Sequence, residues 1–247
     1  QNILTTLRMS NIYIPSYNRP NKVRTFDLLG VGRIVVPQSQ AAEYRKNYGD
    51  AVMSIPDNKD GSVNKKRNAI IDLIKLQQED QSAWVLDDDL KGIKRKKEGN
   101  MLSADEIIEL FEKTEIMAKD MGAKFAGFDY SEDCMKLKDM TPFSLTKPCF
   151  HSVYLNVSDG IRYDERLRVQ GDLEYWIAKM NVNRFGLKLN QYAALSFGED
   201  GDASSVIGYN KNDRLKGAIA INNKYGRKII THNKKGNQKF TIPIKGA

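Results

Sequence analysis

Residues 83–89 are Ala-Trp-Val-Leu-Asp-Asp-Asp, a short apolar run that ends directly in three acidic residues. Three similar apolar runs precede it along the chain, NIYIP at residues 11–15, RIVVP at 33–37 and AVMSIP at 51–56. Short continuous apolar runs of this kind are typical of buried parallel strands. Helical patterns lie between them, so the sequence predicts an α/β fold with a mostly parallel central sheet flanked by helices.

Capping residues mark two of the expected helices. Ser62 precedes an apolar stripe, and Ser103 with Glu106 forms a capping-box pattern before a second stripe. The residues expected to face the core are Ala69, Ile70, Leu73 and Ile74 in the first helix and Ile107, Ile108, Phe111 and Met117 in the second.

Beyond residue 124 the regular alternation of strand and helix changes, so the sheet is expected to become mixed. Strands are predicted at 124–128, 142–146, 150–157 and 187–197, and near Ile229 and Phe240. Helices are predicted at 171–180, with Leu173, Ile177 and Met180 inward, and around 213–223, and a loop at 198–205.

The composition excludes several classes of protein. The 247 residues are 40% hydrophobic and 28% charged, which is typical of a globular protein, and no apolar stretch approaches the roughly 18 residues of a membrane span. The N-terminal residues lack the pattern of a signal peptide. Two cysteines are too few for a disulfide framework or a cysteine zinc site, so we expect a reducing, cytoplasmic location.

The excess of positive charge lies at the C-terminal end. Residues 211–247 contain ten Lys or Arg and one acid, whereas the preceding residues contain 29 basic and 30 acidic side chains. Such asymmetry favours a polyanionic partner such as nucleic acid, although a solvated surface gives the same composition. We expect one domain, residues 1–210, with a basic extension, residues 211–247, packed on it.

The three acids after residue 86 are the strongest local signal for chemistry. Ligands of open α/β sheets bind at the carboxyl ends of the strands, where these acids stand. Mg²⁺ and Mn²⁺ prefer carboxylate oxygens, and they commonly bridge one or two carboxylates to substrate phosphates. Because alternate residues point the same way, Asp87 and Asp89 are expected to share one metal site. The alternative is a helix cap or a solvated turn.

Two further loops follow other strands of the same expected sheet. The first, IPSYNRP at 14–20, offers a hydroxyl, an aromatic ring and a guanidinium to an anion or a base, and the alternative is a simple turn. The second, DNKDGSVNKKRN at 57–68, places basic residues in the first turns of a helix, where the helix dipole disfavours them. Phosphate binding would explain that cost, and a solvated face is the alternative.

Together with GDLEYW at 171–176, these segments resemble glycosyltransferases of the GT-A fold, over roughly residues 11–200. The resemblance implies a GT-A-like mixed central sheet and a hexosyltransferase that uses Mn²⁺ (or Mg²⁺) and a nucleotide-sugar donor, expected to be UDP-linked. It implies nucleotide-sugar binding by Pro15, Ser16, Tyr17, Arg19, Asp57, Lys66, Arg67, Asp87 and Asp88. It implies metal binding by Asp89 and Asp87, together with a late histidine, for which His232 is the candidate and a surface position the alternative.

In inverting members of this fold an acidic residue that opens a later helix is the catalytic base. Asp172 stands at that position, and Glu174 is the rival. The usual pattern there is Glu-Asp, but this chain has Gly171 in place of the Glu. The other histidine, His151, is interpreted mainly as a strand residue that could also line the acceptor site.

Within that fold the chain looks most like the TET-associated glycosyltransferases of bacteriophages and the base J glucosyltransferases. IPSYNRP, VPQSQAAEY (36–44), GSVNKKRNAII (61–71) and WVLDDD (84–89) carry this resemblance. It implies a hydroxymethylated pyrimidine in DNA, such as 5-hydroxymethylcytosine, as the acceptor, and the cytoplasm of a bacterial host as the location. DNA contacts are expected from the basic run at 91–97 and from the tail, at Lys94, Arg95, Lys224, Arg227, Lys228, Lys234 and Lys235.

Several alternatives remain open at this point. The same fold can act on a glycan or another acceptor, and a nucleotidyltransferase or nuclease can also use Asp87 and Asp89. A DNA-binding module without activity would use the acids only as a cap. The sequence leaves the sugar, the base, the stereochemical course and the oligomeric state undecided.

Overall fold

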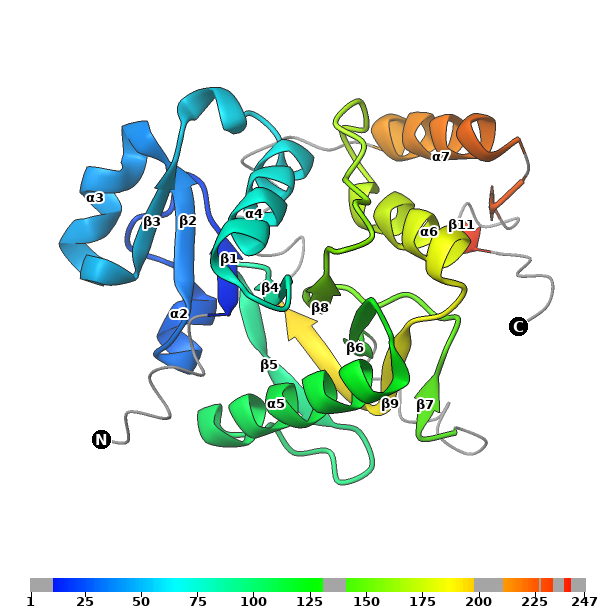
Figure 1. Cartoon of the computed structure of the whole chain (residues 1–247), viewed down its shortest axis with the longest axis horizontal. Helices are drawn as coiled ribbons and strands as arrows, with labels where there is room; N and C mark the ends of the chain where they lie inside the picture. The colour runs from blue at the N-terminus through cyan, green and yellow to red at the C-terminus, as the bar shows by residue number, and fades with distance from the viewer. Residues whose placement is uncertain (1–10, 131–140, 198–210, 227, 233–237, 241–247) are drawn as a thin grey trace.

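A computed structural model describes residues 11–130, 141–197, 211–226, 228–232 and 238–240 (Figure 1). Within these residues the main sheet has nine strands, eight of them in the order β3-β2-β1-β4-β8-β6-β9-β5, with β7 paired to β9. The strands are β1 (Ile12–Pro15), β2 (Arg33–Pro37), β3 (Val52–Ile55), β4 (Ser82–Leu86), β5 (Leu90–Arg95), β6 (Phe125–Asp129), β7 (Phe143–Ser144), β8 (Ser152–Asn156) and β9 (Leu187–Ser196).

The strand directions divide the sheet into a parallel half and a mixed half. Strands β1 to β4 are mutually parallel, β8 runs antiparallel between β4 and β6, and β9 is parallel to β6. The predicted α/β class, with a mixed central sheet flanked by helices, is therefore confirmed. The four strands predicted before residue 87 agree with β1 to β4 to within one residue at each end.

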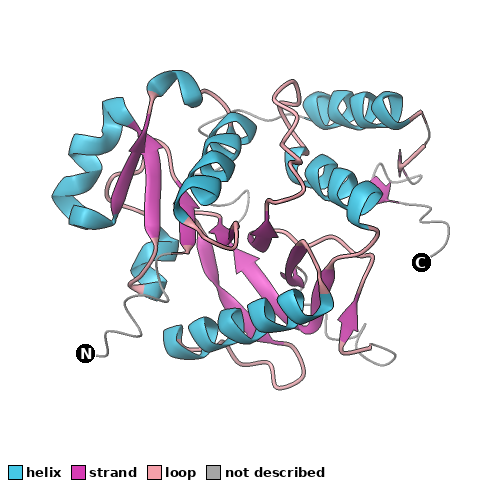
Figure 2. Ribbon diagram, in the orientation of Figure 1, coloured by secondary structure: helices cyan, strands magenta, loops and turns pink. Residues whose placement is uncertain are grey.

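Helices cover both faces of the sheet (Figure 2). Alternate residues of one strand point to opposite faces: Ile12 and Ile14 of β1 belong to one apolar cluster and Tyr13 to the other. The first cluster is covered by α2 (Arg24–Leu29), α3 (Gln38–Tyr48) and α5 (Ala104–Met121). The second is covered by α4 (Val63–Gln77), α6 (Gly171–Asn183) and α7 (Lys211–Tyr225).

The predicted caps are confirmed. The Ser62 side chain accepts a hydrogen bond from the Lys65 amide, and Ser103 and Glu106 form a complete capping box. Ile107 and Phe111 are buried as expected, but the expectation for Met117 is wrong, because its side chain is 38% exposed. Met117 lies outside the stripe of α5 that faces the sheet, and Thr114 and Ala118 take the inward positions.

The basic run after the three acids forms strand β5, which the sequence analysis did not predict. β5 is the last strand in the sheet order and pairs only with β9 among the described strands. Lysines on an edge strand hinder pairing with other chains, which gives this run a structural role. The sequence pattern missed β5 because Leu90 and Ile93 are its only large apolar residues, while its partner lies about a hundred residues later.

The C-terminal part adds α7 and a two-stranded ribbon, β10 (Ile230–His232) with β11 (Gln238–Phe240). Ala218 and Ile221 of α7 are buried in the same apolar cluster as α6. The predicted strand at 142–146 is shorter than expected, and the predicted loop at 198–205 lies outside the described residues. No helix in the described part of the chain has the length and apolar character needed to cross a membrane.

Candidate active site

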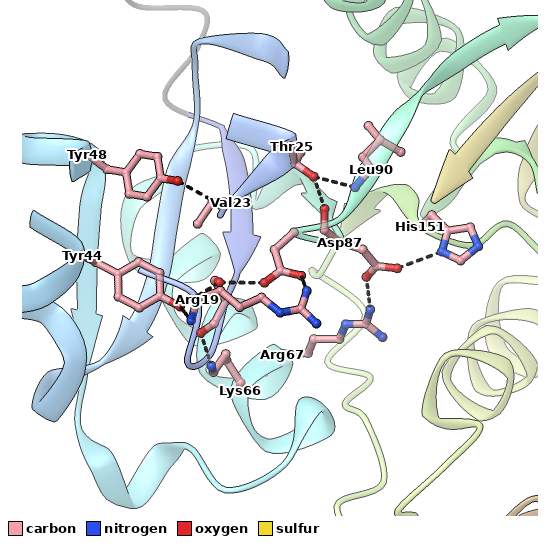
Figure 3. Close-up of polar contacts among 12 residues, drawn as sticks. Arg19, Val23, Thr25, Tyr44, Tyr48, Lys66, Arg67, Asp87, Leu90 and His151 are labelled. Carbon is pink, nitrogen blue, oxygen red and sulfur yellow. Dashed lines mark hydrogen bonds and ion pairs between the residues drawn. The ribbon is translucent and has the colours of Figure 1, made fainter. Parts of the chain in front are cut away.

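The loop after β1 and the acids after β4 lie together at one edge of the sheet, as predicted (Figure 3). Ser16 Oγ donates a 2.7 Å hydrogen bond to Asp88, and Arg19 Nη1 lies 3.0 Å from the other oxygen of the same carboxylate. Tyr44 of α3 fixes the loop, because its hydroxyl bonds Ser16 Oγ and accepts from the Arg19 amide. Burial raises the pKa of Asp88, although the bond from Ser16 and the charge of Arg19 oppose this rise.

Arg67 joins the acidic turn to the start of α6. Its Nη2 lies 2.6 Å from Asp87 Oδ1, and its Nη1 contacts Asp172. The Arg67 side chain is only 8% exposed, whereas that of Asp172 is 44% exposed. The structure therefore brings together three of the predicted site residues, and Asp172 is the one that stays open to solvent.

His151, interpreted from the sequence mainly as a strand residue that could also line the acceptor site, lies beside the acidic turn. It precedes β8, its Nδ1 lies 3.0 Å from Asp87 Oδ2, and its carbonyl accepts from the Asp87 amide. Its backbone has φ 64°, a left-handed conformation that a histidine seldom adopts and that often marks a functional site. Burial opposes ionisation of both groups, but Arg67 and His151 hold the pKa of Asp87 below its usual value, and Asp87 raises the pKa of His151.

Asp89 is the acid of this turn that lacks a counter-ion. In the described part of the chain its carboxylate makes no ion pair or hydrogen bond, and its carbonyl accepts from the Phe197 amide. Burial, followed by repulsion from Asp87 and Asp88, raises its pKa to about 6. An uncompensated carboxylate of this kind is suited to binding a cation.

The donor set fits a metal ion that is bound together with a phosphate ligand. Among the described residues, no three histidine, cysteine or acidic side chains converge into a metal cage. Mg²⁺ and Mn²⁺ do not require a cage, since they are commonly held by one or two carboxylates and by substrate phosphates. Asp89 and Asp87 can supply those carboxylates. His232 belongs to β10, and its side chain lies outside the described part of the structure.

The other residues predicted to bind the nucleotide occupy different environments. Pro15 ends β1, and Tyr17 is 45% exposed with its ring centroid 5.1 Å from Lys66 Nζ. Lys66 is buried against Asp60, and burial lowers its pKa despite that partner. Its Nζ donates a hydrogen bond to the Ser16 carbonyl, so Lys66 stabilises the loop after β1. The exposed Asp57 carboxylate accepts two 2.9 Å hydrogen bonds from Ser39.

The structure does not bring Glu174 to the site. Its side chain is fully buried, and its Oε1 accepts from the Tyr225 hydroxyl and pairs with Lys224, each at 2.7 Å. Lys224 also pairs with Asp164 at 2.9 Å. Glu174 of α6 therefore binds two side chains of α7 and stabilises the packing of the two helices. Lys224, which we expected to contact DNA, forms ion pairs with Glu174 and Asp164 instead.

The structure accounts for the glycine that departs from the expected Glu-Asp pair. A Cβ atom at position 171 would clash with Oδ1 of Asn64. The Asn64 amide group donates 2.9 Å hydrogen bonds to the carbonyls of Asp164 and Leu167. Asn64 therefore fills the space beside α6 that a side chain at position 171 would need.

A narrow pocket lies between the acidic turn and α6. One wall is aromatic, because the rings of Tyr163 and Tyr175 stack at 3.9 Å with an interplanar angle of 5°. The Tyr175 hydroxyl is buried and has no hydrogen-bond partner within the described residues. The polar side chains at the pocket are Arg67, Asp87, His151 and Asp172.

The residues predicted to bind DNA are dispersed. β5 starts beside Asp89 and runs away from it, so Lys94 lies about 15 Å along the strand from the acids. Arg95 packs over Tyr192, 5.9 Å from the ring centroid. Lys228 is exposed, and Arg227, Lys234 and Lys235 lie outside the described residues.

This chain is similar to one known protein family and to several solved structures. The model of one protein family, described as TET-associated glycosyltransferase, matches residues 10–199. A search of curated proteins found no match. Among solved structures, S. aureus TarS 1–349 is similar with a TM-score of 0.48 and 13% identity, over 86% of this chain and 65% of that chain. The structure of the same fragment in complex with UDP has a TM-score of 0.47 and 14% identity, over 87% of this chain and 71% of that chain. This chain spans 65% of the length of the first of these structures.

Proposed function

This chain belongs to the family of TET-associated glycosyltransferases, and from that premise we propose that it moves a sugar from a UDP-sugar to a 5-hydroxymethylpyrimidine in DNA, with inversion at the sugar carbon. Membership makes it a glycosyltransferase; the donor, the acceptor, the metal and the stereochemical course are our proposal. The observation that carries it is the contact of Arg67 with both Asp87 and Asp172, because it brings the acidic turn beside an exposed carboxylate.

The residues divide into a donor side and an acceptor side. Asp87 and Asp89 bind the metal, with His232 as a further candidate ligand. The remaining donor contacts come from Pro15, Ser16, Tyr17, Arg19, Asp57, Lys66, Arg67 and Asp88, of which Lys66 acts by supporting the loop after β1. On the acceptor side Asp172 lines the narrow pocket and is exposed to solvent, so its carboxylate can meet an acceptor hydroxyl.

The proposed step is a displacement at the sugar. The acceptor hydroxyl oxygen bonds to C1 while the bond from C1 to the diphosphate oxygen breaks, and the hydroxyl proton passes to a carboxylate oxygen of Asp172. A bound Mn²⁺ or Mg²⁺ supplies positive charge next to the leaving diphosphate. Arg67 contacts Asp172 and holds its carboxylate beside the acidic turn.

The basic extension is proposed to contact the DNA backbone. Lys228 is exposed, whereas Lys224 is held by Glu174 and Asp164. We therefore assign the phosphate contacts of this region to Lys228, Arg227, Lys234 and Lys235. Lys94 and Arg95 would contact DNA only where it extends along β5, away from the acidic turn.

The test uses the full chain with Mn²⁺, a panel of nucleotide sugars, and DNA that contains hydroxymethylcytosine or hydroxymethyluracil. We expect a hexose-sized mass gain on one nucleoside after digestion. Asp172→Asn should lower turnover at least about a hundredfold and leave UDP-sugar affinity nearly unchanged, since general-base catalysis contributes about 10²–10⁴-fold. The matched control is Asp120→Asn, an exposed carboxylate on α5.

Each other outcome removes a defined part of the proposal. Release of nucleoside diphosphate without a mass gain would keep the sugar donor and reject the DNA acceptor. Loss of donor binding in Asp172→Asn would give Asp172 a structural role. If no nucleotide sugar binds with or without Mn²⁺, the proposed donor is wrong.

A further inference from the structure

The turn that holds the three acids has an unusual internal arrangement. Residues 87–90 connect β4 to β5, and in a closed turn of four residues the first carbonyl accepts from the fourth amide. Here a side chain from another element stands between those two groups. Thr25 Oγ1 accepts from the Leu90 amide at 2.9 Å and donates to the Asp87 carbonyl (Figure 3).

Thr25 makes a further contact with the same turn. Its own amide donates a 3.2 Å hydrogen bond to the Asp88 carbonyl. One residue in the first turn of α2 thus satisfies three backbone groups of the acidic turn. Thr25 is completely buried, so no solvent molecule can replace its hydroxyl without a rearrangement.

α2 is itself held in place beside the site. The amide of Val23, the residue before α2, donates a 2.9 Å hydrogen bond to the Tyr48 hydroxyl of α3. Two further backbone groups of the turn have partners outside it, because the Asp87 amide donates to the His151 carbonyl and the Asp89 carbonyl accepts from the Phe197 amide. The backbone of the turn is therefore held from outside. The Asp87 and Asp88 carboxylates bond neighbouring side chains, and the Asp89 carboxylate makes no ion pair or hydrogen bond within the described residues.

We propose that Thr25 is a positioning residue for the acidic turn: its hydroxyl, inserted between the Asp87 carbonyl and the Leu90 amide, holds Asp87 and Asp89 in the arrangement that binds a divalent cation with a nucleoside diphosphate. This inference rests on the proposed function for the ligand but not for the geometry. Without the hydroxyl, the two backbone groups would either stay unpaired in the protein interior or bond each other directly. A direct bond would close the turn and move the carboxylates.

The matched variants are Thr25→Val, Thr25→Ser and Thr114→Val. Valine keeps the shape of threonine without its hydroxyl, and serine keeps the hydroxyl. Thr114 is an equally buried threonine whose hydroxyl donates at 2.7 Å to the Leu110 carbonyl inside α5. It controls for the loss of a buried hydroxyl that does not touch the turn.

The first measurement is calorimetric titration of UDP into each full-length protein with and without Mn²⁺. Residues that orient metal ligands typically change metal affinity 10–100-fold when replaced. We expect Thr25→Val to weaken Mn²⁺-dependent UDP binding at least about tenfold, and Thr25→Ser and Thr114→Val to stay within about threefold of the wild type. Equal binding by Thr25→Val, or an equal loss in Thr114→Val or Thr25→Ser, would overturn the proposal.

The second measurement does not depend on any ligand. Crystal structures of Thr25→Val and Thr25→Ser should differ at residues 87–90, with the Asp87 carbonyl and the Leu90 amide directly bonded only in the valine variant. An unchanged turn in Thr25→Val would overturn the inference. If the wild type binds no UDP while the turn closes as expected in Thr25→Val, the proposed ligand fails and the positioning role stands.

Discussion

Replacement of Arg67 by methionine tests the central contact of the site. Methionine retains much of the apolar stem but removes the guanidinium that contacts Asp87 and Asp172. Asp87 would then depend on His151 alone for charge compensation. We expect a marked loss of stability together with loss of glycosyl transfer, because the start of α6 would no longer be tied to the acidic turn.

The size of the effect follows from the burial of the two groups. Breaking a buried ion pair by removal of one partner costs about 3–5 kcal/mol. The Asp87 side chain is 26% exposed and keeps its bond to His151, so we expect about 2–3 kcal/mol at pH 7. Arg162→Met, which breaks a pair with Asp72 whose side chains are both 40% exposed, should cost less than about 1 kcal/mol.

The pH dependence supplies an independent check. The pKa of Asp87 is lowered in the folded protein, so its stabilising contribution is present above the unfolded value of 3.8 and is lost as the pH falls through the folded value. The difference in unfolding free energy between the wild type and Arg67→Met should therefore decrease as the pH is lowered from 7 towards 3.

Urea denaturation at several pH values measures both effects. The double variant Arg67→Met/Asp87→Asn removes the stranded charge as well, and it should recover part of the lost stability. A loss below about 1 kcal/mol in Arg67→Met, or a double variant that loses the full sum of the single changes, would refute the reasoning, because coupled residues are not additive.

Three further changes test the site from other directions. Gly171→Ala should lose about 1–3 kcal/mol by overpacking against Asn64, and Asn64→Ala should partly rescue it in urea denaturation, whereas full additivity would contradict the predicted clash. Asp89→Asn should stabilise the metal-free protein by about 1–2 kcal/mol at pH 7.5, because the pKa of Asp89, raised to about 6, makes its ionised form unfavourable there. This gain in stability should vanish near pH 4. A gain that persists at pH 4 would exclude the charge of Asp89 as its cause. His151→Asn, which tolerates the left-handed backbone, should weaken Mn²⁺-dependent UDP binding about tenfold in calorimetry with little change in Tm, and unchanged affinity would show that the ring is dispensable.

The sequence predicted most of the sheet because its central strands are buried on both faces. Such strands are continuous apolar runs, and this explains why β1, β2 and β4 were located. β3 lies at the end of the sheet with Ser54 exposed, and its buried Val52 and Ile55 belong to the apolar run that marked it. β5 was missed because an edge strand needs few apolar residues and takes its hydrogen bonds from a distant partner. Met117 was misplaced because an apolar residue next to a stripe is not distinguished by spacing from one within it.

The site was predicted in part, and the limits have a physical cause. Strand ends share an edge, so the meeting of Ser16 and Arg19 with Asp88 followed from the order of the motifs. The contact of Arg67 with Asp172 joins residues about a hundred positions apart and depends on where α6 packs. The role of His151 depends on a left-handed backbone that no local pattern marks, and the assignment of Lys224 to DNA overlooked a buried glutamate as its partner.

The place of β8 in the sheet has a consequence for folding during synthesis. β8 comes from residues 152–156, yet it forms the junction between β4 and β6, antiparallel to both. The ribosome therefore completes both neighbours before the strand that joins them, and the hydrogen-bonding edge of β4 stays open for about 65 further residues. Late, non-local pairing of this kind slows folding, and an open apolar edge attracts other chains. A nascent chain halted before residue 152 should therefore depend on chaperones that shield β4.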